Sequence, residues 1–329
     1  STVALNSAMV GRIHMFGVLI IPFIMIAMAF GRKGFRGIVP YLLFAGVSTG
    51  AVMFVLSNFV GAEVTSMGTG FLSILLSVAY VRLVGIRTPE EYRHHAGAQQ
   101  RKYSAVKALS PYIFMMVILP AVRYGVPALF ENGFAVMCTF GYIFWVDIVI
   151  LICGVLGAVT LGVGLKQYME VCGETAKNVL PVFITIGSLL VVSYLMQSDR
   201  TGMMNLIATD VAAVVGPFYP AAAVLIGSSG AFVTGTGLGS NIMFADMHMQ
   251  AAASLGINPI TVFAGQNAGA SLGNLICPNN TVAACATVGE EGNEGKVMRK
   301  TLVAFGIILV LYMTLTMLYT YVLFPHFGA

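Results

Sequence analysis

Apolar residues along this chain of 329 residues come in long runs, which short polar or charged segments separate. No run alternates between apolar and polar positions with a period of two, so the pattern excludes the strands of an outer-membrane barrel. A helix needs about 20 mainly apolar residues to cross a bilayer. On this basis we predict spans at 13–30, 38–58, 67–85, 108–122, 142–164, 179–197 and 301–324.

Two further apolar blocks, at 211–255 and 259–289, are interrupted by glycines, hydroxyls and amides. Such residues would unravel a lipid-facing helix, because the freed backbone groups find no water there; they are tolerated where they line a cavity. The sequence therefore predicts an all-α, polytopic helical membrane protein with broken or re-entrant helices. Transporters of this kind are commonly built from inverted repeats, of which this chain contains mostly one.

The predicted organisation has three parts. Residues 1–200 hold about six spans, with a cytoplasmic loop at 86–107 and an amphipathic loop at 166–178. Residues 201–300 hold the broken helices, and residues 301–329 hold the last span and the C-terminus.

Composition supports a multi-pass protein of the cell membrane. Apolar residues make up 58% of the chain and charged residues only 9%, whereas a soluble domain carries roughly a quarter charged residues. The net charge of +4 would indicate a nucleic-acid partner in a soluble protein. Here the basic residues gather in alternate loops, which sets the orientation in the membrane, so we expect no nucleic acid.

Other chemistry has little support in the sequence. The five cysteines are odd in number and show no CxxC spacing, and the histidines lack metal-ligand spacing, so we expect no metal and no cofactor. No HExxH, GxSxG or P-loop pattern occurs, which argues against an enzyme or a primary pump. The alternatives left open are an intramembrane enzyme and a non-transporting membrane subunit.

The two broken blocks carry the candidate binding chemistry. Half-helix N-termini offer peptide dipoles to an anion at lower cost than a buried charge. We predict two uncoiled tips that face one small anion, with Ser240 or Asn241 capping the helix after the first tip. In the second block Pro278 ends one segment, and Asn280 or Thr281 caps the next. The predicted substrate-binding residues are Thr234, Thr236, Ser240, Asn241, Gln266, Asn267, Ser271, Asn274, Asn279, Asn280 and Thr281.

The alternative is that these small and polar residues only pack helices against one another. Packing accounts well for Ala268, Ala270 and Ala283. It does not account for the amides, which have no reason to cluster in a span that only packs.

A proton-coupled transporter needs a group that changes its charge inside the membrane. The candidates are Asp246, His248 and Asp210. His248 lies seven residues after Asn241 and shares its helix face, whereas Asp246 points about 160° away at 100° per residue. The alternatives are a satisfied interhelical hydrogen bond for His248 and a snorkelling interfacial charge for Asp246.

Several segments, taken in order, resemble the lactate permease family of bacteria and archaea. They are MVGR at 9–12, SNFVGAE at 57–63, GAFVTGTGLGSN at 230–241, GQNAGASLGNLICPNNTVAACATVG at 265–289, and EG followed by MRKTL within 294–302. The resemblance implies a secondary active transporter that moves lactate, glycolate and similar 2-hydroxymonocarboxylates with protons. Another organic anion, or coupling to sodium, stays open.

The family's members are longer and carry several additional spans before the MVGR segment. We therefore expect a separate chain that supplies the N-terminal half, an incomplete gene product or, less favoured, a homodimer that replaces the lost repeat.

Overall fold

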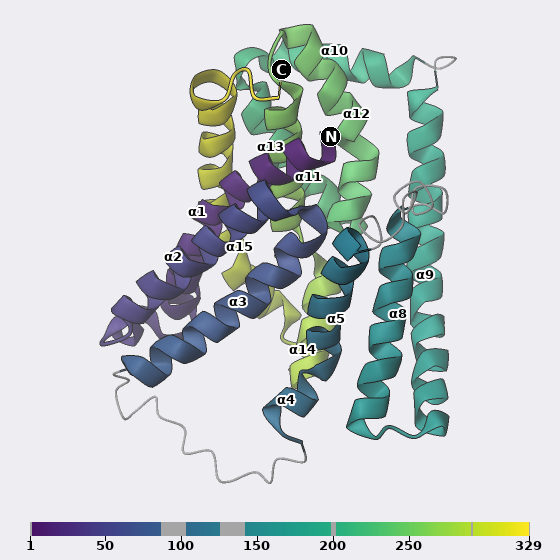
Figure 1. The fold of residues 1–329 in the computed structure, drawn as a ribbon. Helices are drawn as coiled ribbons and strands as arrows, with labels where there is room; N and C mark the ends of the chain where they lie inside the picture. The colour runs from purple at the N-terminus through teal and green to yellow at the C-terminus, as the bar shows by residue number, and fades with distance from the viewer. Residues whose placement is uncertain (1, 87–102, 126–141, 199–201, 291, 329) are drawn as a thin grey trace. The chain divides into compact units, whose positions relative to one another are not determined.

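The computed structural model describes residues 2–86, 103–125, 142–198, 202–290 and 292–328, and throughout these ranges the regular elements are helices (Figure 1). This confirms the all-α class. Five described helices are long and apolar enough to cross a membrane: Thr2–Phe35, Val39–Val60, Val64–Leu83, Leu206–Thr234 and Glu294–Leu323. Three shorter apolar helices, Ser110–Pro120, Asp147–Leu161 and Gly187–Met196, lie within the spans predicted at 108–122, 142–164 and 179–197.

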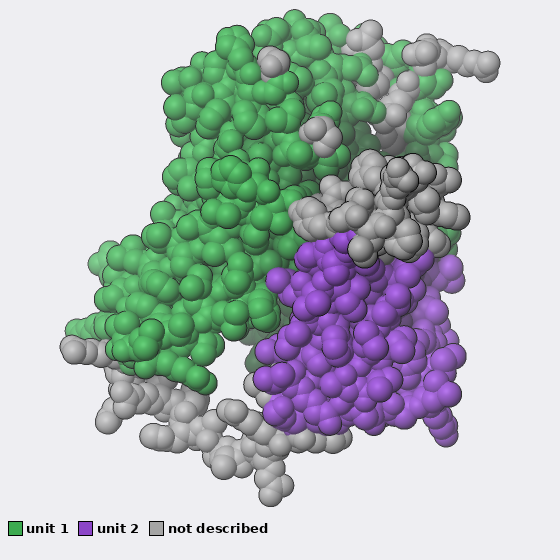
Figure 2. Space-filling view, in the orientation of Figure 1, with its two compact units in different colours: residues 1–89, 183–329 green, residues 90–182 purple. Residues whose placement is uncertain are grey.

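The chain divides into two compact units, residues 90–182 and residues 1–89 together with 183–329 (Figure 2). The described helices of the smaller unit are α4 (Ala105–Ala108), α5 (Ser110–Pro120), the π-helical turn η4 (Ala121–Gly125), α8 (Tyr142–Leu161) and the first half of α9 (Leu165–Gln197). Within this unit α5 packs against α8.

The larger unit holds the candidate site. Besides the end of α9, its elements are α1 (Thr2–Phe30), η1 (Gly31–Phe35), α2 (Val39–Val55), η2 (Leu56–Val60), α3 (Ala62–Leu83), α10 (Met203–Val215), η5 (Gly216–Phe218), α11 (Tyr219–Thr234), α12 (Gly237–Leu255), α13 (Pro259–Gly273), α14 (Pro278–Val288), α15 (Glu294–Leu318) and η6 (Tyr319–Leu323). Helix α13 packs against α1, α11, α12 and α15, and is buried along most of its length.

Glycines bring α13 and α11 together without intervening side chains. A methyl group on Gly269 would overlap the carbonyl oxygen of Val224, and one on Gly273 would overlap that of Ser228. From the other side, Gly227 lies against the backbone of Gln266. In a membrane, where lipid is as apolar as leucine, such close van der Waals packing is a main source of helix association.

Phe324 and Phe327, which follow the last helix, contact both α1 and the start of α13. Asn258 caps α13 by accepting from the Ile260 N–H, and its amide donates to the carbonyl oxygens of Phe324 and Phe327 at 3.3 and 2.9 Å. The guanidinium of Arg12 lies over both phenylalanine rings, 4.7 and 4.5 Å from their centroids. Cation–π attraction therefore stabilises the Arg12 guanidinium, which has no carboxylate partner among the described residues.

The first interruption is shorter than predicted, and its cap is a different residue. Helix α11 ends at Thr234, the next residue Gly235 adopts φ +76°, and Thr236 caps α12 by accepting from the Gly239 N–H at 2.8 Å. The prediction that Ser240 or Asn241 caps this helix is wrong, because both lie inside α12.

The second interruption was predicted at Pro278, and it lies just before this residue, at 274–277. The helix continues through Gln266 to Gly273, because its glycines serve close packing and not uncoiling. Pro278 begins α14, so Asn280 and Thr281 lie within that helix and do not cap it.

Of three other predictions, one needs correction, one agrees with the structure, and one lies mostly outside the described residues. The predicted amphipathic loop 166–178 is helical, since it belongs to α9; charged side chains are tolerated on an exposed helix. The span predicted at 38–58 agrees with the apolar helix Val39–Val60, whose last turn is the π-helical η2 and which is followed by Gly61 with φ +143°. Most of the predicted loop 86–107 lies outside the described residues.

Replacing Gly269 with alanine tests the glycine contact. The added methyl meets backbone atoms of α11, so we expect the free energy of unfolding to fall by about 1–3 kcal/mol. Gly306→Ala on α15 is the matched control, because nothing lies within 4 Å of the added methyl. Thermal unfolding in detergent should show a lower Tm for the first variant only; equal Tm values would contradict the packing argument.

Candidate functional site

The predicted substrate residues separate into three groups in the structure. One group lies where the two helix interruptions meet, a second forms a buried hydrogen-bond network, and a third lines a cavity. What distinguishes the groups is how much hydrogen-bonding capacity each has left for a ligand.

The two interruptions adjoin, as the two-tip hypothesis expects. A methyl group on Gly235 would lie 3.6 Å from Asn279 Nδ2 and 3.8 Å from Cys277 Sγ. Most polar side chains here bond to nearby groups, however. Thr234 Oγ1 lies 2.9 Å from the carbonyl oxygens of Gly230 and Thr236, and Thr236 caps α12. Asn280 donates to the backbone carbonyl and the side-chain oxygen of Asn274 at 3.3 and 3.4 Å. Thr281 donates to Cys277 O.

The buried network joins α11, α12 and α13. His248 Nε2 lies 3.1 Å from Gln266 Oε1, and Nδ1 lies 2.9 Å from the Tyr219 hydroxyl. Gln266 Nε2 donates to Ser240 Oγ and Asn241 Oδ1 at 3.1 and 3.2 Å. Ser240 in turn donates to the Gly227 carbonyl at 2.7 Å.

Both ring nitrogens of His248 form hydrogen bonds when the imidazole is neutral. Gln266 Oε1 only accepts, so His248 Nε2 carries the hydrogen, and Nδ1 accepts from the Tyr219 hydroxyl. Both amide hydrogens of Gln266 are also used. Tyr219, Ser240, His248 and Gln266 are fully buried. The arrangement agrees with the satisfied-hydrogen-bond alternative for His248, and it uses all the hydrogen-bonding groups of the His248 ring and both amide hydrogens of Gln266.

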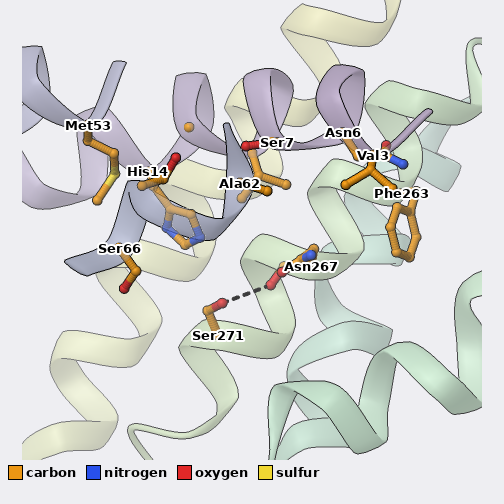
Figure 3. Close-up of a pocket in the computed structure, with 13 residues that line it drawn as sticks. Val3, Asn6, Ser7, His14, Met53, Ala62, Ser66, Phe263, Asn267 and Ser271 are labelled. Atoms are coloured by element: carbon orange, nitrogen blue, oxygen red, sulfur yellow. Dashed lines mark hydrogen bonds between the residues drawn. The ribbon is translucent and has the colours of Figure 1, made fainter. Parts of the chain in front are cut away.

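The third group contributes to an open cavity of about 520 Å³ between α1, α3 and α13 (Figure 3). We call it the α1–α3–α13 cavity. Its lining residues are Val3, Asn6, Ser7, Val10, Gly11, His14, Met53, Ala62, Thr65, Ser66, Phe263, Asn267 and Ser271. Figure 3 shows the imidazole of His14 directed from α1 into the space bordered by Ser66, Asn267 and Ser271.

Polar groups of this cavity keep unused hydrogen-bonding capacity. The side-chain oxygen of Asn6, Oδ1, is buried without a hydrogen-bond partner. The side-chain amide of Asn267 and the hydroxyl of Ser66 form no hydrogen bond with any described residue. Ser271 donates to Asn267 O at 3.1 Å, and its oxygen is still able to accept. A buried polar group without a partner is costly, so in a native protein it needs an explanation such as a ligand or water.

Sequence reasoning missed the walls that α1 and α3 contribute. Ser7 and His14 lie seven residues apart and so share one face of α1, with Asn6 beside Ser7, and this was the available signal for a polar face inside a span. At η2 the SNFVGAE segment breaks the helix, and α3 starts at Ala62 without a side-chain cap. Gly11 of MVGR lets η2 approach, because a methyl there would overlap Ser57 Oγ.

The predicted proton-coupling residues lie apart from this cavity. Asp210 and Asp246 are exposed, and His248 is fully buried in the network. Asp246 and His248 point in different directions from α12, as their spacing predicts. Their coupling role stays a prediction. Within the described residues, no group of three or more His, Cys, Asp or Glu side chains could hold a metal ion.

Comparison with known proteins gives one consistent result. The family model described as L-lactate permease matches residues 2–140 and 131–324. The chain is 23% identical to an L-lactate permease of Streptococcus iniae, over 74% of this chain and 53% of that protein. It is 24% identical to a glycolate permease of Escherichia coli strain K12, over 89% and 61%. For an L-lactate permease of Bacillus subtilis strain 168 the identity is 23%, over 95% and 64%.

The chain thus spans between 53% and 64% of the length of these relatives. No solved structure matches it. The matches are to permeases and not to enzymes, and with the five apolar helices they make the chain a multi-pass protein of the cell membrane.

Replacing Gln266 with leucine tests the buried network. The variant leaves the His248 N–H without an acceptor, and we expect a loss of about 1–3 kcal/mol in unfolding free energy. Gln250→Leu on the exposed side of α12 is the control, and its Tm should match the parent. If thermal unfolding in detergent does not separate the two variants, the network is not a source of stability.

Proposed function

Because this chain belongs to the L-lactate permease family, we propose that it is a secondary active transporter of small 2-hydroxymonocarboxylates such as lactate and glycolate, driven by proton symport. The names of its relatives support the substrate class. The observation that carries the proposal is the α1–α3–α13 cavity, whose polar side chains come from helices otherwise rich in apolar residues.

The lining chemistry suits a hydroxy acid. Amide N–H groups of Asn6 and Asn267 and the hydroxyl of Ser66 supply neutral donors for a carboxylate, and the Asn6 carbonyl oxygen supplies an acceptor for the 2-hydroxyl. Neutral donors are suited to a cavity between apolar helices, since a lysine or arginine inside a membrane is costly. Weak, neutral contacts also let a transported anion leave again.

The start of α3 adds backbone donors. Ala62 and Thr65 line the cavity, and Gly61 before them provides no side-chain cap, so the first N–H groups of this helix are donors for a ligand. We predicted helix N-termini as anion donors at the two tips, whereas the start of α3 is the end of a helix long enough to span a membrane. The tips stay a prediction as a second contact region, and so does a separate chain for the N-terminal half.

Transport is tested by uptake of labelled lactate into proteoliposomes made with protein purified from its native membranes, together with any co-purifying chain. We expect accumulation when the outside is more acidic than the inside, and collapse of accumulation with a protonophore. A sodium gradient alone should give none. Uptake that follows sodium, or that ignores the pH gradient, would contradict proton symport; no uptake would contradict the transporter proposal.

Comparing Asn267→Ala with Asn280→Ala tests whether the substrate binds in the cavity or at the helix interruptions. Asn267 lines the cavity, whereas Asn280 lies outside it and bonds Asn274. Loss of one hydrogen bond to a charged carboxylate costs about 1.5–3 kcal/mol, so we expect Kd for lactate to rise roughly tenfold or more in the first variant. Kd in the second should be unchanged. A rise in Kd for Asn280→Ala, with no change for Asn267→Ala, would indicate that the substrate binds at the helix interruptions instead.

A further inference from the structure

His14 separates two cavities of the larger unit. It lines the α1–α3–α13 cavity and also a second cavity of about 490 Å³ between α1, α13 and α15. The second cavity is mostly apolar, with Ile21, Met25 and Ile308 among its lining residues. Ser271 is the other residue that lines both. The imidazole therefore stands where a group moving between the two cavities would pass.

Tyr312 of α15 holds the His14 ring in place. The hydroxyl lies 2.9 Å from His14 Nδ1, and the two rings meet edge to face with centroids 5.3 Å apart. Gly17 provides the room, because a methyl there would overlap the tyrosine hydroxyl. His14 Nε2 has no hydrogen-bond partner among the described residues. His248 differs, since both of its nitrogens are bonded.

The described groups that face His14 from its neighbours are almost all uncharged. Asn267 and Ser271 come from α13, Thr65 and Ser66 from α3, and Tyr312 is the titratable group from α15. On α1 itself, Arg12 packs over the rings of Phe324 and Phe327. A proton on His14 would therefore place a single positive charge in the cavity wall, beside donors suited to a carboxylate.

We propose that His14 takes up the symported proton when the carboxylate binds, and that Tyr312 positions its ring. This inference rests on the proposed function. The proton adds to the ring nitrogen that lacks one, so that Nδ1–H donates to the Tyr312 oxygen and Nε2–H donates to the substrate carboxylate. The resulting pair has no net charge, which lowers the cost of leaving water compared with either ion alone. On release, the carboxylate leaves and the ring returns its proton to water.

The test is calorimetric binding of lactate to the purified protein at about pH 7, in two buffers with different ionisation enthalpies. We expect the parent protein to take up about one proton per lactate, and its Kd to rise about tenfold per pH unit as the pH increases. His14→Asn places an amide near the position of Nδ1, so Tyr312 keeps a partner, but this side chain cannot be protonated. In this variant both proton uptake and the pH dependence of Kd should disappear.

Two variants complete the experiment. His326→Asn, at an exposed histidine near the C-terminus, should behave as the parent. Glu63→Gln removes an acid in the SNFVGAE segment and should retain proton uptake. Uptake that survives in His14→Asn, or that disappears in Glu63→Gln, overturns the assignment of the proton to His14. Absence of any lactate or glycolate binding by the parent would instead refute the proposed function, and the inference with it.

Discussion

The contact between α11 and α13 is the constraint on which the rest of the larger unit depends. Without a hydrophobic drive between helices in lipid, their register is set by where backbones come close enough to touch. Gly227, Gly269 and Gly273 provide those positions. Once they are seated, Gln266 faces α12, where it bonds Ser240, Asn241 and His248, and the rotation of α13 about its axis is fixed.

Adjacent residues of α13 consequently have opposite uses. Gln266 and Asn267 point about 100° apart on the helix. The first is fully buried with its amide and oxygen bonded, whereas the second borders a cavity with its amide unused. The hydrogen bonds of Gln266 and His248 stabilise and specify one packing arrangement, and they leave neither side chain a hydrogen to donate to a ligand. Binding needs groups whose hydrogen-bonding capacity is not yet met, and these lie on the α1 side of the helix.

The spans were predictable because hydropathy follows directly from composition, and the helix interruptions were predictable because glycine and proline mark them. The caps were not, since Gly235 ends α11 early and makes Thr236 the first residue able to cap. The sequence also singled out Asn267 and Ser271, but not His14 or Asn6. A single sequence carries hydropathy and local geometry; it does not say which distant helix will lie opposite a given face, and here that pairing determines the cavity.

The His14–Tyr312 hydrogen bond joins positions 298 residues apart, and the bond from the Tyr319 hydroxyl to Arg12 O joins positions 307 apart. During synthesis α1 is made long before α15, because domains emerge N-terminal end first at about 5–20 residues per second. For that interval the polar face of α1, with Asn6 and His14, has no partner from the last helix. The contacts between α1 and α15 are therefore among the last that this unit is able to form.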